Sequence, residues 1–240
     1  MPLKESHGNM YPWVTHMHTH LAGECRHKCS YCYVGRTRAG RPEKYTGAPR
    51  ILEKEFAVNY GRGRTIFIEH MNDLFGPGIE APWIIRILDH CRAFQENTYV
   101  FQTKNPGRAD DFLDGFPDNV LFGTTIETNH RIPQSQAPPP IERYRAMQSL
   151  KQRGLGCFFK TFGLFITIEP IMAFDLPPLM NWIKEISPAF VNIGADSKGC
   201  GLPEPTALEV RQLIDSLSTA GIVIRKKMNL GRFGIQGEHG

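Results

Sequence analysis

The chain lacks any hydrophobic run of membrane-spanning length. Nowhere do apolar residues continue for the roughly 18 positions that a transmembrane helix needs. The first 13 residues also lack the apolar core of a secretory signal peptide. These absences predict a cytoplasmic protein with no membrane partner.

The chain also has little net charge, because 28 basic residues face 24 acidic ones and leave a balance of +4. A dedicated nucleic-acid binder normally concentrates many more Lys and Arg on one face. The composition therefore permits a nucleic-acid partner without requiring one.

Internal repeats and low-complexity blocks are missing as well. The nearest approach is the proline-rich segment 131–140, which resists both helix and strand. With 41% hydrophobic and 22% charged residues, the composition is that of a globular protein and excludes disordered, collagenous and coiled-coil classes. A length of 240 residues predicts one domain over 1–240, with a basic C-terminal strand and tail over 222–240.

Short apolar runs alternate with amphipathic stretches. Most of the runs are continuously apolar, which is typical of parallel strands covered on both faces. The expected strands are 13–18, 65–69, 98–102, 120–126, 164–168, 190–193 and 222–225.

Between them, apolar residues recur at helical spacing in 84–94, 179–186 and 210–217. Thr206 and Glu209 form a predicted capping box at the start of the last helix, and Gly221 ends it. Six or seven such units, against eight in a closed barrel, predict an α/β fold with an incomplete TIM-like barrel of parallel strands. Functional residues are then expected at the carboxyl ends of the strands.

Three of the six cysteines lie close together, at Cys25, Cys29 and Cys32, just after the first expected strand. Three thiolates on one loop suit three irons of a cubane cluster and leave the fourth iron open, whereas a closed zinc site needs four ligands. Disulfides are disfavoured in a reducing cytoplasm. The alternatives are core thiols or a zinc site completed by a histidine.

The CxxxCxxC spacing over 25–33, with Tyr31 before the last cysteine and Tyr33 after it, resembles the motif of the radical S-adenosylmethionine (radical SAM) superfamily. The resemblance implies a 4Fe-4S cluster on Cys25, Cys29 and Cys32, with SAM on the open iron and Tyr31 at the cofactor. It also implies a flavodoxin- or ferredoxin-like external electron donor, and hydrogen abstraction by a 5′-deoxyadenosyl radical.

Further segments are similar to an uncharacterised family of short radical SAM proteins of phage and bacterial genomes, and more distantly to the spore photoproduct lyase group. They are 70–75, 101–104, 119–127 and 168–170. The closer family supplies no reaction, so nucleotide, nucleic-acid and small-molecule substrates stay open.

Superfamily members usually carry Gly-Gly-Glu after the second strand, but this chain has Glu69-His70-Met71-Asn72-Asp73. Asn72 and Asp73 are expected to accept hydrogen bonds from the SAM ammonium, with Glu69 a candidate only if it faces the site. The alternative is that they cap the following turn.

Polar residues end the next strands too. The resemblance implies that Lys104 binds the SAM carboxylate, with a solvated loop lysine as the alternative. Thr124, Thr125 and Glu127 suit the ribose hydroxyls and the methionyl group. Glu169 is a further candidate contact of SAM or substrate.

The remaining cysteines divide by position. Cys91 and Cys157 are expected in the core, whereas Cys200 lies in the glycine-rich loop 194–201 on the expected catalytic face. A thiol there is a candidate hydrogen-atom donor, with an idle loop cysteine as the alternative.

Two other function classes compete. His16, His18 and His20 alternate along the first strand and so point to one side. This pattern is typical of a metal-dependent hydrolase, with His16 and His18 as metal ligands. The sequence shows no matching set of ligands downstream. A non-catalytic iron-sulfur or zinc protein that binds nucleic acid is the other class. Its contacts would be Arg26, Lys28, Arg36, Arg38, Arg41, Arg225, Lys226, Lys227 and Arg232.

Overall fold

The computed structural model describes residues 3–7, 10–36, 43–153 and 160–237. Its centre is an eight-stranded sheet in the order β1-β2-β5-β6-β7-β8-β9-β10. β1 is antiparallel to β2, and all the other neighbours are parallel. The bounds are β1 Lys4–Glu5, β2 His16–His18, β5 Thr65–Ile68, β6 Thr98–Thr103, β7 Asn119–Thr125, β8 Thr161–Ile168, β9 Phe190–Ile193 and β10 Ile224–Lys226.

All seven strands expected from the apolar runs are present, with shifted ends. β2 is shorter than expected because the chain turns before it, where the Val14 amide donates to the Tyr11 carbonyl. β8 is longer, because Thr161 to Gly163 pair with the start of β7. The apolar runs thus located the strands, and pairing with neighbours set their limits.

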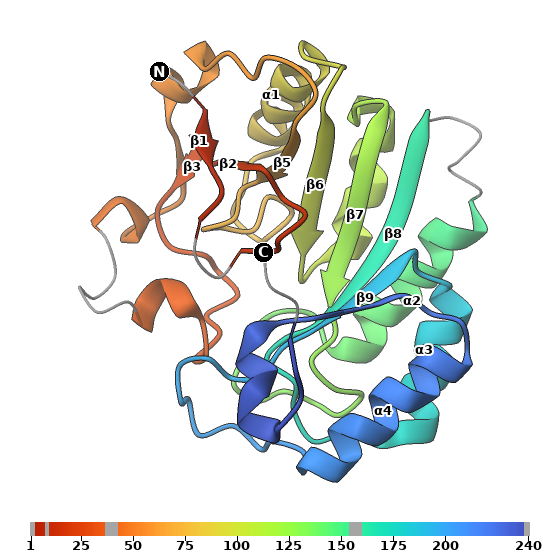
Figure 1. Cartoon of the computed structure of the whole chain (residues 1–240). Coiled ribbons are helices and arrows are strands. Elements are labelled where there is room, and N and C mark those ends of the chain that lie inside the picture. Colours follow the sequence, from red (N-terminus) through yellow and green to blue (C-terminus); the bar gives the residue numbers. More distant parts are fainter. Residues whose placement is uncertain (1–2, 8–9, 37–42, 154–159, 238–240) are drawn as a thin grey trace.

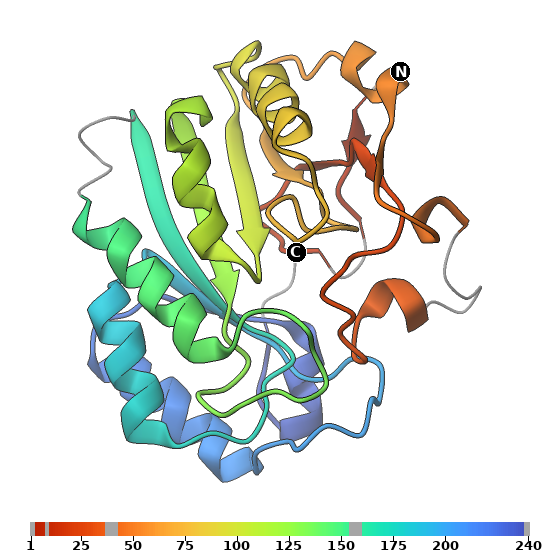
Figure 2. The ribbon, with the colours of Figure 1, turned by 180° about the vertical axis from the view of Figure 1, so that it is seen from behind.

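Four α-helices cover one face of the sheet, as seen from behind in Figure 2. They are α1 Ala81–Arg92, α2 Pro140–Gln152, α3 Leu176–Ile186 and α4 Ala207–Thr219. The capping box of α4 is confirmed, since Thr206 accepts from the Glu209 amide and Glu209 accepts from the Thr206 amide. α2 was not predicted, because its apolar positions form only a weak stripe; it begins at Pro140, a residue tolerated in the first turn of a helix.

The main core lies between the sheet and these helices and contains Ile66 and Phe101 from the strands and Leu88 and Leu213 from the helices. Cys91, on α1, is fully buried in it as expected. Cys157 lies outside the described residues. A smaller apolar group, with Tyr11 and Phe165 among its members, packs on the other face of the sheet.

The sheet is an incomplete barrel. Its edge strands in the described residues, β1 and β10, do not pair with each other, and the α/β class expected from the sequence is confirmed. In Figure 1 the arrows of β5, β6 and β7 point downward, toward the half of the molecule that holds the red-orange segment 25–36. No helix among the described residues is long and apolar enough to cross a membrane.

Candidate functional site

The cysteine loop 25–33 lies in the connection between the two strands of a short ribbon, β3 Leu21–Ala22 paired with β4 Arg50–Ile51. Gly23 leads into it with φ of +86°, and a Cβ atom there would lie 2.2 Å from the Ala48 carbonyl oxygen. Only glycine fits this position. The loop then turns tightly, since the Cys32 amide donates to the Cys29 carbonyl at 3.1 Å. The local backbone therefore places three cysteines on one compact loop.

The proline-rich segment 131–140 packs beside this loop and makes backbone hydrogen bonds with it. The Ser30 amide donates to the Gln134 carbonyl at 2.9 Å, and the Gln136 amide donates to the His27 carbonyl at 2.7 Å. The Ser135 hydroxyl lies 3.1 Å from the Cys29 sulfur. Sequence reasoning gave this segment no role. Its prolines could have indicated this role, because they keep the chain out of helices and strands and leave its backbone groups free to bond to another segment.

The three thiols are free and half-buried. Burial, with the Asp73 carboxylate adding to it, raises the pKa of the Cys25 thiol to about 12. Among the described residues, the three cysteine sulfurs do not form a group with all its atoms within 4.8 Å of one another. Thiolates on a single tetrahedral zinc would lie roughly 3.8 Å apart, given Zn–S bonds of about 2.3 Å. The sulfurs are therefore not arranged around a single zinc ion.

Beside the loop lies a network of four side chains, here called the ion network: Tyr31, Lys104, Glu127 and Arg143. The fully buried Glu127 carboxylate pairs with the Lys104 ammonium through Oε1 and with Arg143 Nη1, 2.8 Å away, through Oε2. The Tyr31 hydroxyl donates to Glu127 Oε1 at 2.6 Å. Three residues expected at the cofactor, from the cysteine loop, β6 and β7, thus meet at one carboxylate.

The charges of this network set its protonation. Burial raises the pKa of the Glu127 carboxyl, but Lys104 and Arg143 outweigh it and hold the pKa at about 2. Burial and the Glu127 charge together raise the pKa of the Tyr31 hydroxyl far above its ordinary value. At neutral pH the network therefore holds an ionised carboxylate, two cations and a neutral phenol.

Arg143 was missed from the sequence. It lies on α2, a helix whose pattern was too weak to predict, and it is almost completely buried. Its guanidinium also donates to the backbone carbonyls of Thr125 and Pro138, at 3.0 and 2.6 Å. A single arginine therefore ties α2 to β7 and to the proline-rich segment.

The segment after β5 connects the sheet to the cysteine loop. Asp73 accepts hydrogen bonds from the Thr103 hydroxyl, His27 Nε2 and the amides of Phe75 and Lys104, at 2.7 to 3.0 Å. Its carboxylate is therefore fully used inside the protein, and through His27 it holds the cysteine loop.

The two other candidates of this segment differ from Asp73 and from each other. Asn72 is half-buried and donates to the Gly23 carbonyl at 3.1 Å. Glu69 points away from the cysteine loop and accepts from the amides of His20 and Leu21. The Asn72 Oδ1 atom also accepts from the Asp73 amide at 3.0 Å, so Asn72 joins the backbone before the cysteine loop to the segment after β5.

The remaining candidates lie at the carboxyl ends of β7 and β8. Thr124 and Thr125 are buried, and their hydroxyls bond to the Thr103 carbonyl and the Gln102 amide. Glu169, after β8, pairs with Lys227 at 3.1 Å and accepts from Asn229 at 3.3 Å. The C-terminal tail thus reaches Glu169 with Lys227, which the sequence suggested only as a nucleic-acid contact, and with Asn229, which it did not single out.

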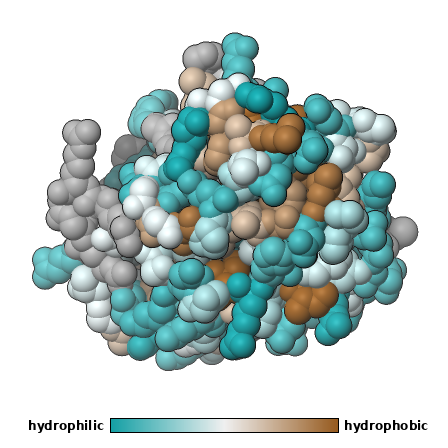
Figure 3. All heavy atoms as spheres, turned by 90° about the horizontal axis from the view of Figure 1, so that it is seen from below, coloured by the Kyte–Doolittle hydropathy of each residue, from teal (hydrophilic) through white to brown (hydrophobic). Residues whose placement is uncertain are grey.

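Cys200 approaches the cysteine loop through apolar packing. Tyr31, Ile132, Met172 and Leu202 form a small buried group, and both Cys29 and Cys200 pack against it. The face of the molecule seen from below in Figure 3 is mostly hydrophilic, with apolar side chains showing between the polar ones. The structure therefore brings the expected hydrogen donor and the cysteine loop to one apolar group.

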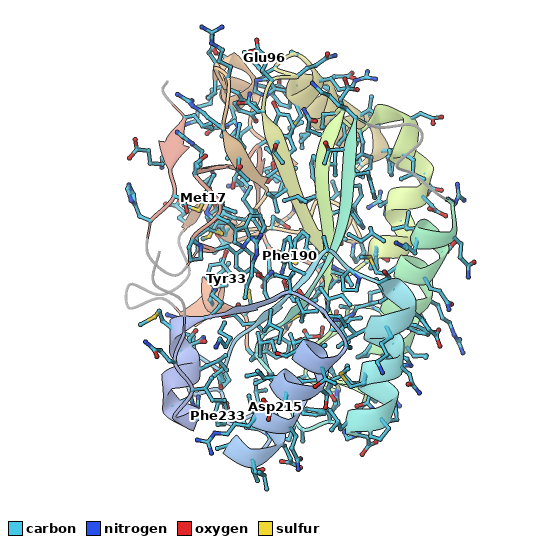
Figure 4. All side chains as sticks on the ribbon, turned by 45° about the vertical axis from the view of Figure 1, so that its right-hand side comes forward. Met17, Tyr33, Glu96, Phe190, Asp215 and Phe233 are labelled. Carbon is cyan, nitrogen blue, oxygen red and sulfur yellow. The ribbon has the colours of Figure 1, made fainter. Side chains whose placement is uncertain are left out.

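The end of the sheet opposite the cysteine loop carries a surface depression but none of the predicted site residues. In Figure 4, Glu96 marks the upper end of the molecule, far from Tyr33 of the cysteine loop. A surface depression there is lined by Gly61 and residues 92–96. None of the residues predicted for the site lines it.

Of the three histidines along the first strand, His16 is separate from the other two. His16 bonds to the Thr15 hydroxyl, whereas His18 and His20 are buried and lie beside His90 of α1. Burial lowers the pKa of His18 and of His20, so that both are neutral. The pairing of His16 with His18 expected for a hydrolase is not observed.

Several basic residues expected to contact nucleic acid have acidic partners. Lys28 pairs with Glu24, Lys227 with Glu169, and Arg232 with Glu204. The side chains of Arg36, Arg38 and Arg41 lie outside the described residues. The described basic residues therefore do not form one uncompensated patch.

Solved structures with a similar fold include spore photoproduct lyase. One variant aligns with a TM-score of 0.56 at 16% identity, covering 78% of this chain and 57% of that chain. Another, with bound AdoMet and dinucleoside spore photoproduct, aligns with a TM-score of 0.56 at 13% identity, covering 90% and 65%. The chain thus spans less than two thirds of these proteins, and the likeness concerns the fold.

No curated protein matches the sequence. A family model described as a protein of unknown function, DUF5131, matches residues 12–150. Because the match covers more than half of the sequence, the chain belongs to the DUF5131 family.

Proposed function

We propose that this protein is a radical SAM enzyme, with a 4Fe-4S cluster on Cys25, Cys29 and Cys32. The observation that carries the proposal is the position of these thiols, on one compact loop at the carboxyl end of an incomplete parallel barrel, beside the ion network. Ligand sites of barrels with parallel strands lie at this end.

The residues present fit such a cluster. Three free thiols on one loop serve three irons and leave the fourth open. When bound and reduced by an external flavodoxin- or ferredoxin-like donor, the cluster and SAM supply a 5′-deoxyadenosyl radical.

The ion network suits the amino-acid end of SAM, which is a zwitterion. Lys104, 18% exposed at its side chain, offers a cation to the carboxylate, and Glu127 offers an anion to the ammonium. Arg143 and Tyr31 keep Glu127 ionised and in place when Lys104 changes partner. The internal Lys104–Glu127 pair therefore prepares a site for a ligand that carries both charges.

Other predicted residues surround this point in supporting roles. Asn72 is assigned to the ammonium, Thr124 and Thr125 to the nucleoside side, and Glu169 to SAM or the substrate. Asp73 is reassigned as a positioning residue, because its oxygens are used by His27, Thr103 and backbone amides. Cys200, packed on the same apolar group as Cys29, is assigned as hydrogen-atom donor to a substrate radical.

The experiment is anaerobic reconstitution with iron and sulfide, followed by reduction in the presence of SAM. We expect a brown protein that releases 5′-deoxyadenosine. Alanine at Cys25, Cys29 or Cys32 should abolish both iron binding and 5′-deoxyadenosine, whereas Cys91→Ala, in the main core, is the matched control that keeps its iron. Full iron content and charge-transfer absorption in a loop variant would refute the assignment.

Cys200→Ser separates two roles of that thiol. A hydrogen donor should leave iron content and SAM cleavage intact and change only the fate of the substrate. Loss of iron in Cys200→Ser would instead make Cys200 a fourth ligand, and the cluster would then have no open iron for SAM.

For the substrate we propose a nucleotide or nucleic acid. Support comes from a structural neighbour that holds a dinucleoside spore photoproduct and from the exposed Arg26 beside Cys25. Binding to labelled DNA and RNA should weaken steeply with salt. The variant Arg26→Glu with Lys226→Glu is the appropriate test, because Lys227 is engaged by Glu169. Absence of salt-sensitive binding at low ionic strength, in protein that cleaves SAM, would favour a small molecule.

A further inference from the structure

A second group of polar side chains is buried between the sheet and α1, away from the ion network. It consists of His18 in β2, His20 just after it, Tyr60 before β5 and His90 on α1, and it is called the histidine group below. One ring nitrogen of each histidine lies within 4.8 Å of the others. Tyr60 and His20 are fully buried, and His18 and His90 nearly so. Figure 2 shows α1 in front of this edge of the sheet.

The outer nitrogen of each ring is fixed by an acceptor. His18 Nε2 lies 3.2 Å from Glu55 Oε2, and His20 Nδ1 lies 2.9 Å from Glu69 Oε1. His90 Nε2 lies 2.9 Å from the Val58 carbonyl oxygen. The Val58 carbonyl oxygen can only accept, so His90 Nε2 carries the ring proton, and with Glu55 and Glu69 ionised the outer nitrogens of His18 and His20 carry theirs. Histidine ligands of metals show this arrangement, with the far N–H donated to a carboxylate or carbonyl.

The inner nitrogens are then left with lone pairs that face one another. His20 Nε2 lies 2.8 Å from His90 Nδ1, and neither has a proton to donate. The Tyr60 hydroxyl lies 2.5 Å from His18 Nδ1 and 3.1 Å from His20 Nε2, but it carries a single proton. In this protonation state three lone pairs and one hydroxyl converge, and a cation at their centre would satisfy all of them.

We propose that the histidine group is a structural site for a divalent transition metal of the zinc type. The ligands are His18 Nδ1, His20 Nε2 and His90 Nδ1, with the Tyr60 oxygen as the fourth. Ligand atoms of a tetrahedral zinc site lie roughly 3.3 Å apart, given Zn–N bonds of about 2.0–2.1 Å. Three of the ligand pairs are 2.5 to 3.1 Å apart and the histidine nitrogens all lie within 4.8 Å of one another, so small movements of the rings would bring them to this geometry.

The partners of the outer nitrogens and the burial of the group agree with this assignment. Glu55 and Glu69 lie behind the outer nitrogens, as the carboxylates that orient metal-bound histidines do. Tyr60 and His20 are fully buried and His18 and His90 nearly so, so four ligands would fill the site without an open position for a substrate, and the site is structural. The ion would join β2, α1 and the segment before β5, and this goes beyond the radical SAM function.

The test measures zinc and iron together, by mass spectrometry of anaerobically purified protein expressed with both metals. We expect about one zinc per chain in addition to the iron. The variant with Cys25, Cys29 and Cys32 all changed to Ala should lose iron and keep zinc. His18→Gln with His90→Gln should lose zinc and keep iron, whereas His16→Ala, from the same strand but outside the group, should keep both.

A readout that needs no histidine variant covers the case in which those variants fail to fold. The triple cysteine variant is stripped with a chelator and titrated with Co²⁺. Tetrahedral Co²⁺ absorption at one equivalent and a raised melting temperature are expected. Zinc far below one per chain, with no Co²⁺ spectrum and no thermal shift, would overturn the proposal and leave a shared proton between His20 and His90. Loss of zinc together with iron in the triple cysteine variant would also overturn it, while the iron result tests the cluster separately.

Discussion

The ion network and the histidine group are both buried and polar, yet they satisfy their polar atoms in opposite ways. In the ion network, the Glu127 carboxylate has two cationic partners and a hydroxyl donor. In the histidine group, the inner nitrogens have one hydroxyl proton among three acceptors. The first group is complete as it stands, and the second has the ligand atoms for the cation proposed above.

Their positions explain the difference. Lys104 reaches partly into solvent at the carboxyl end of the sheet, where it can exchange partners with an incoming ligand. The histidine group is closed beneath α1. A site that must admit a ligand keeps a replaceable internal partner, whereas a site with only a structural role has no such need.

The largest effect should come from breaking the ion network at its most buried member. Arg143→Met leaves Glu127 with half of its positive partners in a fully buried position, which should cost about 3–5 kcal/mol of unfolding free energy. Denaturant unfolding measures it. Arg153→Met, which removes an exposed pair with Asp110, is the control and should cost at most about 1 kcal/mol. Equal losses in the two variants would mean that burial of the network does not matter.

Acid should weaken the ion network in a defined direction. The pKa of Glu127 in the folded state is about 2, below its ordinary value near 4.3. The stability that its ionised form contributes is therefore complete above about pH 4.3 and is lost as the pH falls toward 2. Glu127→Gln has no such proton to take up. Unfolding curves from pH 6 to pH 2 should therefore show a smaller loss of stability in Glu127→Gln than in the wild type. Parallel curves would contradict this role of the carboxylate.

Removing the exchangeable cation should affect binding more than folding. Lys104→Ala removes a charge-assisted hydrogen bond to SAM of about 1.5–3 kcal/mol, or roughly a tenfold to hundredfold change in Kd. Anaerobic titration calorimetry measures the affinity, and iron content should stay unchanged. Lys184→Ala, an exposed lysine of α3, is the control. Unchanged affinity in Lys104→Ala would make this lysine a partner of Glu127 alone.

The smallest effect is expected in the histidine group. Tyr60→Phe removes one hydroxyl and should cost about 1–3 kcal/mol of stability, because it leaves buried nitrogens without that donor or weakens a bound ion. His16→Ala, outside the group, should stay within about 0.5 kcal/mol of the wild type. Thermal unfolding of both variants in the presence and absence of Zn²⁺ provides the comparison. His16→Ala should keep the stabilisation by Zn²⁺ that Tyr60→Phe loses, and an equal zinc dependence of the two variants would contradict the assignment of Tyr60 as a ligand.

The sequence predicted the strands well, because continuously apolar runs such as 98–102 and 164–168 can only be buried. It failed for α2, whose apolar stripe is weak, and with α2 it missed Arg143. Tyr31, Lys104 and Glu127 were named separately. Lys104 and Glu127 follow the neighbouring strands β6 and β7, and the fold places the cysteine loop with Tyr31 beside them. The role of Asp73 also changed once its four hydrogen bonds were visible, since a carboxylate in a sequence does not reveal its partners.

The sequence by itself determined the class of fold and the compact cysteine loop, because apolar periodicity and short-range spacing act over a few residues. The tertiary structure decided which distant side chains share a charge or a lone pair. Glu127 meets Arg143 across 16 residues, and His20 meets His90 across 70. Such contacts depend on how strands and helices pack, because the energy of a buried polar atom is set by its partner in space and not by its neighbours along the chain.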